Sequence, residues 1–246
     1  PATPGDTDQT AWKNLKLWYD KPAKKWTEAL PVGNGRLGAM VFGGTSTERV
    51  QLNEDSLWAG PPVPQDRVGA HEHIARARNL IFEGKYSEAQ QIMQQEVMGP
   101  RISPRSYQTL GDLHITMPGA DGEADSYRRE LDLDTGIATT TFTIDGTTYI
   151  REVFSSPADQ VLVVHLATSK PGGLDIDVAL DRPADFKVAR TPTGGLSMLG
   201  QASHNGKHKG VRYYAQVEAK FSGLGSLQGK TISVQKAQSI TLFLAA

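Results

Sequence analysis

From Tyr107 to the last residue, apolar and polar positions alternate along the chain with a period of two. The alternating runs are QTLGDLHITM, YRRELDLD, IATTTFTIDGTTYIREVF, QVLVVHLAT, LDIDVALD, VRYYAQVEAKF and SITLFLAA. They are rich in Val, Ile, Thr and Tyr, as is typical of strands that bury one face. Asp145-Gly146 between two runs is a strong hairpin signal, because glycine tolerates the positive φ of tight turns. The pattern predicts a mainly β protein, a large antiparallel β-sandwich.

A different period interrupts this pattern in residues 67–99, where apolar residues recur at helical spacing. The recurring positions are Ile74, Ala77, Leu80 and Ile81, and then Ala89, Ile92, Met93 and Val97. We expect Gly84 to end the first helix, Ser87 to cap the second, and Gly99-Pro100 to stop it. The segment is therefore predicted to be a short helical hairpin, inserted into the sandwich and packed on its outside.

Three glycines near the start, Gly33, Gly35 and Gly38, have the G-x-G-x-x-G spacing of a dinucleotide-binding turn. Such a turn works only when a helix follows it and points its N-terminus at the pyrophosphate. Here the following residues are AMVFGGTSTERV, and Gly43-Gly44 disfavours a helix. We therefore expect no nucleotide site, and interpret the glycines as positions of positive φ or of close strand approach.

Composition excludes several classes of function. The formal net charge is −1, with 26 Lys and Arg against 27 Asp and Glu, so neither nucleic acid nor an acidic membrane surface is indicated as a partner. Cysteine is absent, which excludes disulfides, thiolate catalysis and Cys-based zinc sites. No apolar run approaches the ~18 residues of a membrane span. The expectation is a protein that uses no cofactor.

Both ends of the chain carry expectations about its boundaries. Residues 1–11 lack Met and form a polar stretch, interpreted as a leader. Removal of a signal peptide would explain it and predicts a secreted or periplasmic protein, although a boundary placed there for convenience explains it equally well. The last run, SITLFLAA, reads as a strand in progress. The sandwich domain is expected to span residues 12–246 and to be truncated at its C-terminal end.

A long motif in the first quarter of the chain carries a family resemblance. The stretch WTEALPVGNGRLGAMVFGG, followed by LNEDSLWAGPP, resembles the opening of glycoside hydrolase family 95, the α-L-fucosidase family. Weaker similarities follow at YQTLGDLHI, YRRELDLDTGIA, REVFSSPADQVLVVHL and GVRYYAQVEA. The resemblance extends from about Trp12 to Ala246, and it implies the N-terminal β-sandwich domain of such an enzyme.

The resemblance also implies where the chemistry lies. In that family the catalytic residues belong to an (α/α)6 barrel that follows the sandwich, and no barrel sequence is present here. This chain is therefore expected to have no catalytic residues of its own and to dock on the barrel of the same polypeptide. The parent enzyme would hydrolyse α-L-fucosides, such as 1,2-linked fucosylated oligosaccharides, with inversion. A parent that acts on α-L-galactosides remains an alternative, because the two sugars differ by one hydroxyl.

The candidate substrate-binding residues come from the densest part of the motif. They are Asn34, Arg36, Asn53, Glu54 and Trp58, which are expected near the barrel interface. Asn side chains can bond sugar hydroxyls and Trp rings can stack on a pyranose, as Trp26 can too. Packing and loop geometry are the simpler explanations for the same residues.

Two rival functions remain open from the sequence. The first is a stand-alone carbohydrate-binding module. The second is a complete small hydrolase that uses Glu28 and Glu54, with Asp55 as a further carboxylate, since inversion needs two carboxyl groups about 6.5–9.5 Å apart. No metal site is expected. His71 and His73 would point to different sides of a helix, and His204 and His208 lie in a predicted loop.

Overall fold

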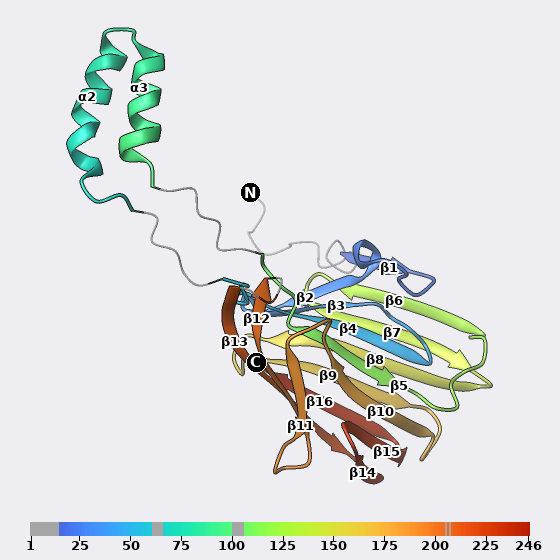
Figure 1. Ribbon diagram of the computed structural model, residues 1–246. Coiled ribbons are helices and arrows are strands. Elements are labelled where there is room, and N and C mark those ends of the chain that lie inside the picture. The colour runs from blue at the N-terminus through green and yellow to red at the C-terminus, as the bar shows by residue number, and fades with distance from the viewer. Residues whose placement is uncertain (1–14, 61–65, 100–105, 205, 207) are drawn as a thin grey trace, which may run out of the picture.

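The computed structural model describes residues 15–60, 66–99, 106–204, 206 and 208–246, most of which form two antiparallel sheets (Figure 1). The larger sheet has nine strands, in the order β1 (Lys16–Tyr19), β6 (Ser126–Asp132), β7 (Ile137–Ile144), β8 (Thr147–Ser156), β9 (Val161–Thr168), β16 (Ser239–Ala245), β13 (His208–Phe221), β12 (Leu196–His204) and β11 (Phe186–Arg190). The smaller sheet has seven strands, in the order β14 (Leu224–Gln228), β15 (Thr231–Ala237), β10 (Leu174–Asp181), β5 (Gly111–Thr116), β4 (Thr47–Glu54), β3 (Leu37–Val41) and β2 (Leu30–Gly33). The predicted class, a large antiparallel β-sandwich, is confirmed.

The hydrophobic core lies between the two sheets and follows the alternation of the sequence. In β5, Leu113 and Ile115 are buried while their neighbours along the strand are less so. In β16, Ile240, Leu242 and Leu244 are buried in the same alternating way. Successive side chains of a strand point to opposite faces, so each strand contributes every second residue to one shared core.

The strand β16 is the last one in the sequence but lies in the middle of the larger sheet. It pairs with β9 on one side and with β13 on the other. The C-terminal run SITLFLAA is therefore a central strand that joins two groups of strands.

The turn between β7 and β8 has the geometry expected from Asp145-Gly146. Ile144 pairs with Thr147 across the turn, and both central residues have positive φ, 49° for Asp145 and 69° for Gly146. These are the signs of a type I′ turn, whose twist matches that of the flanking strands. The predicted hairpin is confirmed.

The opening glycines belong to a strand hairpin and not to a nucleotide-binding turn. Gly33 at the end of β2 is the register partner of Gly38 in β3, and Gly35 in the turn has a φ of 97°. The chain continues from Gly38 as a strand. The interpretation of these glycines as positions of positive φ and of close strand approach is confirmed.

The predicted helical hairpin is also present. It consists of α2 (Ala70–Phe82), α3 (Tyr86–Ile92) and a turn of π-helix, η2 (Met93–Val97). Gly84, with a φ of 74°, lies in the turn between the helices as expected. Ser87 does not cap the second helix: α3 already begins at Tyr86, and the side chain of Lys85 at the cap position makes no capping hydrogen bond.

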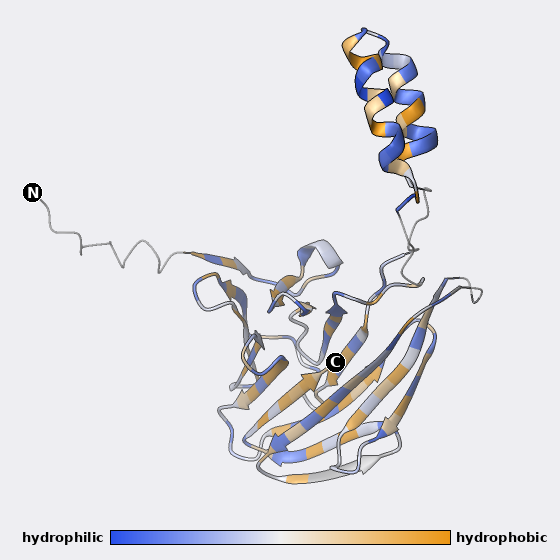
Figure 2. Ribbon diagram, turned by 90° about the vertical axis from the view of Figure 1, so that its left-hand side faces the viewer, coloured by the Kyte–Doolittle hydropathy of each residue, from blue (hydrophilic) through white to orange (hydrophobic). Residues whose placement is uncertain are grey.

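The position of this hairpin differs from the prediction. Its helices make their main contacts with one another, through the buried side chains of Ala77 and Ala89. Figures 1 and 2 show the hairpin projecting away from both sheets, so the expected packing on the outside of the sandwich is wrong. A 3.6-residue period identifies an apolar helix face but not the surface that covers it.

Two further expectations concern other segments. The leader at residues 1–11 and Pro100 of the helix stop lie outside the described residues. None of the helices in the described ranges is long and apolar enough to cross a bilayer.

Candidate functional site

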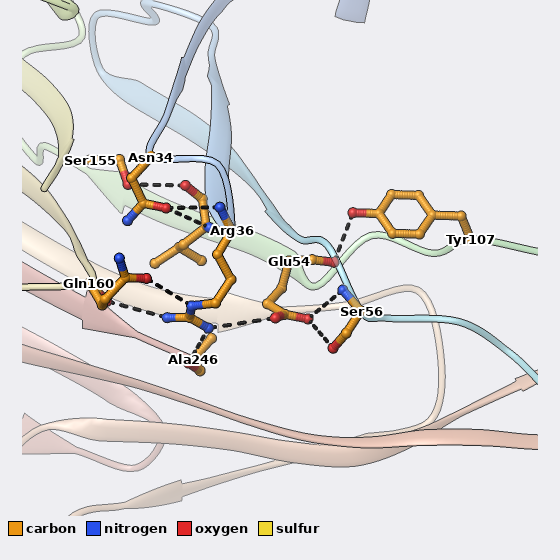
Figure 3. A network of polar contacts seen from close by, with 9 residues as sticks. Asn34, Arg36, Glu54, Ser56, Tyr107, Ser155, Gln160 and Ala246 are labelled. Carbon is orange, nitrogen blue, oxygen red and sulfur yellow. Dashed lines mark hydrogen bonds and ion pairs between the residues drawn. The ribbon is translucent and has the colours of Figure 1, made fainter. Parts of the chain in front are cut away.

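A polar cluster at one end of the sandwich contains three of the five candidate residues (Figure 3). Asn34 lies in the β2–β3 turn, where its Oδ1 accepts hydrogen bonds from the amides of Arg36 at 3.1 Å and Leu37 at 2.9 Å. Its Nδ2 donates to the carbonyl of Ser156 in the opposite sheet at 2.9 Å. Asn34 thus stabilises its own turn and ties that turn to β8.

The guanidinium of Arg36 extends the same connection between the sheets. Its Nε donates to Gln160 Oε1 at 2.9 Å, and its Nη1 donates to the carbonyl of Ala246 at 2.8 Å. Nη1 also lies 3.5 Å from a carboxylate oxygen of Glu54. Ser56 donates to the other Glu54 oxygen from its amide at 3.0 Å and from its hydroxyl at 2.7 Å. We call Asn34, Arg36, Glu54, Gln160 and Ala246 the inter-sheet cluster.

Asn53 and Trp58 do not belong to this cluster, and both lie next to Tyr107. The Trp58 and Tyr107 rings are 5.2 Å apart at an angle of 57°, and the Tyr107 hydroxyl donates to the carbonyl of Glu54 at 2.8 Å. Asn53 is on β4, on the outer face of the smaller sheet. The five candidates therefore form no single site.

A groove runs along this outer face, beside Tyr107, and we call it the β2–β4 groove. It has a volume of about 390 Å³. Its lining comprises Trp26, Pro31, Val32, Gly38, Ala39, Met40, Gln51, Leu52, Asn53, Tyr107, Gln108 and Thr109. Of the sequence candidates for sugar contact, Asn53 and Trp26 lie here. Met40, Gln51 and Tyr107 were missed, and the signal that could have found the first two is their outward position in strands whose inward positions are apolar.

The carboxylates of the small-hydrolase hypothesis do not form an acid and base pair of the required kind. A general acid in a glycosidase needs a raised pKa. The pKa of Glu28 is lowered instead, chiefly because the amide of Lys24 donates to its carboxylate at 2.8 Å. Glu54 is occupied by Ser56 and Arg36. Both carboxylates thus serve turns and the inter-sheet cluster.

One acidic group with a raised pKa, Glu48, lies inside the sandwich. Burial raises the pKa of Glu48, while Arg151 and the amides of Gly43 and Phe42 oppose that effect. Glu48 is 0% exposed and forms an ion pair with Arg151. It has no access to solvent and therefore cannot act on a substrate.

Histidines do not assemble a metal site in the described part of the chain. His71 and His73 are on α2. His204 and His208 are register partners on β12 and β13, so the segment interpreted as a loop is the tip of a strand pair. Within the described residues, no group of three or more His, Cys, Asp or Glu side chains could hold a metal ion.

Comparison with known proteins places the chain in a family. A family model described as "Glycosyl hydrolase family 65, N-terminal domain" matches residues 17–246. The chain belongs to this family. The resemblance that the opening motif carries is confirmed at the level of an N-terminal glycoside hydrolase domain, since the curated relatives are named as α-fucosidases.

The relatives are much longer than this N-terminal domain. "Alpha-L-fucosidase 2" of Arabidopsis thaliana is 33% identical over 94% of the chain and 30% of its own length. "Probable alpha-fucosidase A" of Aspergillus niger is 37% identical over 62% of the chain and 20% of its own length. The protein of the same name from Aspergillus oryzae is 28% identical over 94% of the chain and 33% of its own length. The chain thus spans a third or less of each of these relatives.

Among solved structures, "Putative kojibiose phosphorylase from human microbiome" is similar to the chain with a TM-score of 0.49. It is 11% identical, over 94% of this chain and 32% of that chain.

Proposed function

We propose that this chain is the non-catalytic N-terminal sandwich of an α-L-fucosidase-like glycoside hydrolase. The parent enzyme hydrolyses α-1,2-linked fucosides with inversion, and its catalytic residues lie in a helical barrel that follows the sandwich in the same polypeptide. The observation that carries the proposal is the match to "Alpha-L-fucosidase 2", which covers 94% of this chain but only 30% of that protein.

The carboxylates of the chain support the non-catalytic part of the proposal. Hydrolysis with inversion needs one carboxyl group that protonates the leaving group and another that activates water. Glu28 has a lowered pKa, Glu54 is held by Ser56 and Arg36, and Glu48 is enclosed between the sheets. None of these three is free to perform either step.

The helical hairpin supports the docking part. Ile74, Ile81, Phe82 and Tyr86 all have exposed side chains, although each is large and apolar or aromatic. Helices of 13 and 7 residues are too short to be stable alone in water, where about 12–15 residues are marginal. Their exposed apolar surface needs a partner, and we assign it to the catalytic region of the same polypeptide.

In sequence, the helical hairpin lies between Trp58 and Tyr107, and we call this residue pair the base of the hairpin. It lies where the catalytic region would begin. The strand segments on either side of the hairpin pair through Trp58 and Tyr107. Tyr107 bonds the carbonyl of Glu54, whose carboxylate is paired with Arg36, and Arg36 holds the carbonyl of Ala246. A chain that continues past Ala246 therefore starts beside the base of the hairpin.

Hydrolysis of an α-1,2-fucosyl oligosaccharide tests the activity. We expect release of fucose by the longer polypeptide and none by the 246-residue chain, with the β-anomer of fucose appearing first by proton NMR. Turnover by the short chain would contradict the non-catalytic assignment. Inactivity of both proteins on fucosides would contradict the proposed substrate.

Hydrogen exchange tests the docking. Amides of α2 and α3 are expected to exchange rapidly in the 246-residue chain and to be protected in the longer polypeptide, whereas those of the central strand β16 are protected in both. Equal exchange of the helices in the two proteins would contradict the assigned partner.

A further inference from the structure

The floor of the β2–β4 groove is formed by backbone and neutral side chains. Gly38 and Met40 in β3 and Gln51 and Asn53 in β4 line it. Gly38 has no side chain, and its register partner on β2 is also a glycine, Gly33. The strand hairpin of the opening motif therefore leaves an open strip of backbone at one point of the outer face.

Two aromatic side chains border this floor; the surrounding structure anchors the turn that carries Trp26 and holds the ring of Tyr107. Trp26 begins the 3-10 turn η1 (Trp26–Glu28), whose last carbonyl accepts a hydrogen bond from Arg129 at 2.8 Å. Tyr107 is held by the Trp58 ring and by its hydroxyl bond to Glu54. Both rings line the groove, and 57% of Trp26 and 39% of Tyr107 remain exposed. An aromatic face fixed like that of Tyr107 binds a ligand with little loss of conformational entropy.

The polar side chains of the groove carry amides and hydroxyls. Its described lining contains no Asp, Glu, Lys, Arg or His side chain. The carbonyl oxygen of the Gln51 side chain is buried and has no hydrogen-bond partner among the described residues. An unpaired buried acceptor costs free energy, so a rotation of the half-buried Gln51 side chain that presents this oxygen to a hydroxyl donor in the groove would be favourable.

We propose that the β2–β4 groove is a non-catalytic binding site for a neutral saccharide, with a pyranose ring against Trp26 and Tyr107 and its hydroxyls bonded to Gln51 and Asn53. The C–H face of a pyranose matches an aromatic ring, and its hydroxyls match amides. The uncharged lining offers no partner to a phosphate, a carboxylate or a metal ion, and the amides disfavour a wholly apolar ligand. A volume of about 390 Å³ is within the usual range of small-molecule sites, about 300–1,000 Å³. This proposal does not rest on the proposed hydrolase function.

The test is a titration of the 246-residue chain with 2′-fucosyllactose and with lactose, and of the longer polypeptide, which would cleave 2′-fucosyllactose, with lactose. Binding is followed by tryptophan fluorescence and by amide chemical shifts. We expect saturable binding of at least one of the two sugars, with shifts centred on β3 and β4. Trp26→Ala should weaken it at least tenfold. Trp18→Ala is the matched control, because Trp18 is 56% exposed but lies on β1 of the other sheet, and it should bind unchanged.

The Gln51→Leu variant tests whether sugar binding is lost while the stability of the fold is kept. It removes the unpaired acceptor while keeping a similar volume, so the variant should keep or raise its Tm and bind the sugar at least tenfold more weakly. Equal weakening by Trp26→Ala and Trp18→Ala would overturn the proposal, as would shifts centred on Arg36 and Glu54. Binding by the short chain that disappears in the longer polypeptide would also overturn it, since the groove would then be an interdomain surface. Failure to bind either sugar overturns this site but leaves the proposed hydrolase function to its own assay.

Discussion

Glu48 and Arg151 form an ion pair between the two sheets, with 0% and 1% of their side chains exposed. The Glu48 carboxylate also accepts hydrogen bonds from the amides of Phe42 at 3.1 Å and Gly43 at 2.9 Å. Arg151 donates to the carbonyl of Gly44 at 2.9 Å. Both charged groups thus bind the turn that joins β3 to β4, and β8 is fastened to it from the opposite sheet.

Arg151→Met is expected to lower the free energy of unfolding by about 3–5 kcal/mol, because it leaves the Glu48 carboxylate buried without its counter-ion. Arg128→Met on β6 is the matched control. Arg128 pairs with Glu130 at 2.7 Å but is 48% exposed, so its loss should cost about 1 kcal/mol or less. Urea unfolding measures both. Equal losses would contradict the role given to the buried pair.

Two glycines of the opening motif should respond differently to alanine. Gly35 has a φ of 97° and its added Cβ would meet nothing within 4 Å, so Gly35→Ala carries only backbone strain, about 1–2 kcal/mol. A Cβ on Gly44 would lie 1.9 Å from the carbonyl oxygen of Thr47. Gly44→Ala must move the backbone, and we expect a loss above about 3 kcal/mol. Thermal unfolding distinguishes the two, and a larger loss at Gly35 would contradict the argument.

Arg36→Ala removes the hydrogen bonds to Gln160 and Ala246 and leaves Glu54 without its cation. The expected loss is about 2–3 kcal/mol. Arg36→Lys should recover only part of it, because an ammonium cannot replace the planar fork of the guanidinium. Arg212→Ala, at an exposed arginine on β13, is the control and should change stability by no more than about 0.5 kcal/mol. If chemical unfolding shows equal losses of stability for Arg212→Ala and Arg36→Ala, the role of Arg36 in joining the sheets is contradicted.

Low pH should reduce the stability of the larger sheet by protonating Glu218 on β13. Burial acts to raise the pKa of Glu218, but hydrogen bonds from Thr193, Thr191 and Gln216 outweigh it and the pKa is lowered. The resulting stabilisation is complete above the unfolded pKa of about 4.3 and is lost as the pH falls through the lower folded value.

Glu218→Gln should therefore reduce stability at pH 7 and flatten its decline below about pH 4.3. Unfolding curves at pH 7, 5 and 3 measure this. A decline as steep as that of the unchanged protein would show that Glu218 is not among the groups responsible.

Much of the fold could be predicted from the sequence, because strands, helices and turns depend on patterns of neighbouring residues. Alternation marked the strands, and Asp145-Gly146 marked the β7–β8 turn, since both depend on neighbouring residues. The order of the strands could not be predicted from the sequence. β16 pairs with β9 and β13, and no feature of its own residues indicates those partners. The same applies to the hairpin, whose helical period was clear but whose covering surface was not.

The candidate residues show the same limit. Asn34 and Arg36 belong to a peculiar motif, which drew attention to them, but their partners Ser156 and Gln160 lie more than a hundred residues away. A sequence motif identifies residues that the family requires. It does not show whether they are required for ligand binding or for contact with the opposite sheet. Gln51 lies between the two quoted parts of the motif, Tyr107 opens the weaker similarity YQTLGDLHI, and only folding brought them to one groove.

The central position of β16 governs the order in which the domain can fold during translation. Until residues 239–245 have left the ribosome, the strands from β1 to β9 and those from β11 to β13 remain two separate groups, and each ends in an unpaired strand edge. Unpaired edges readily join other chains. The nascent sandwich is therefore exposed to misassembly until β16 is synthesised, and β16 joins the two groups of the larger sheet in a single step.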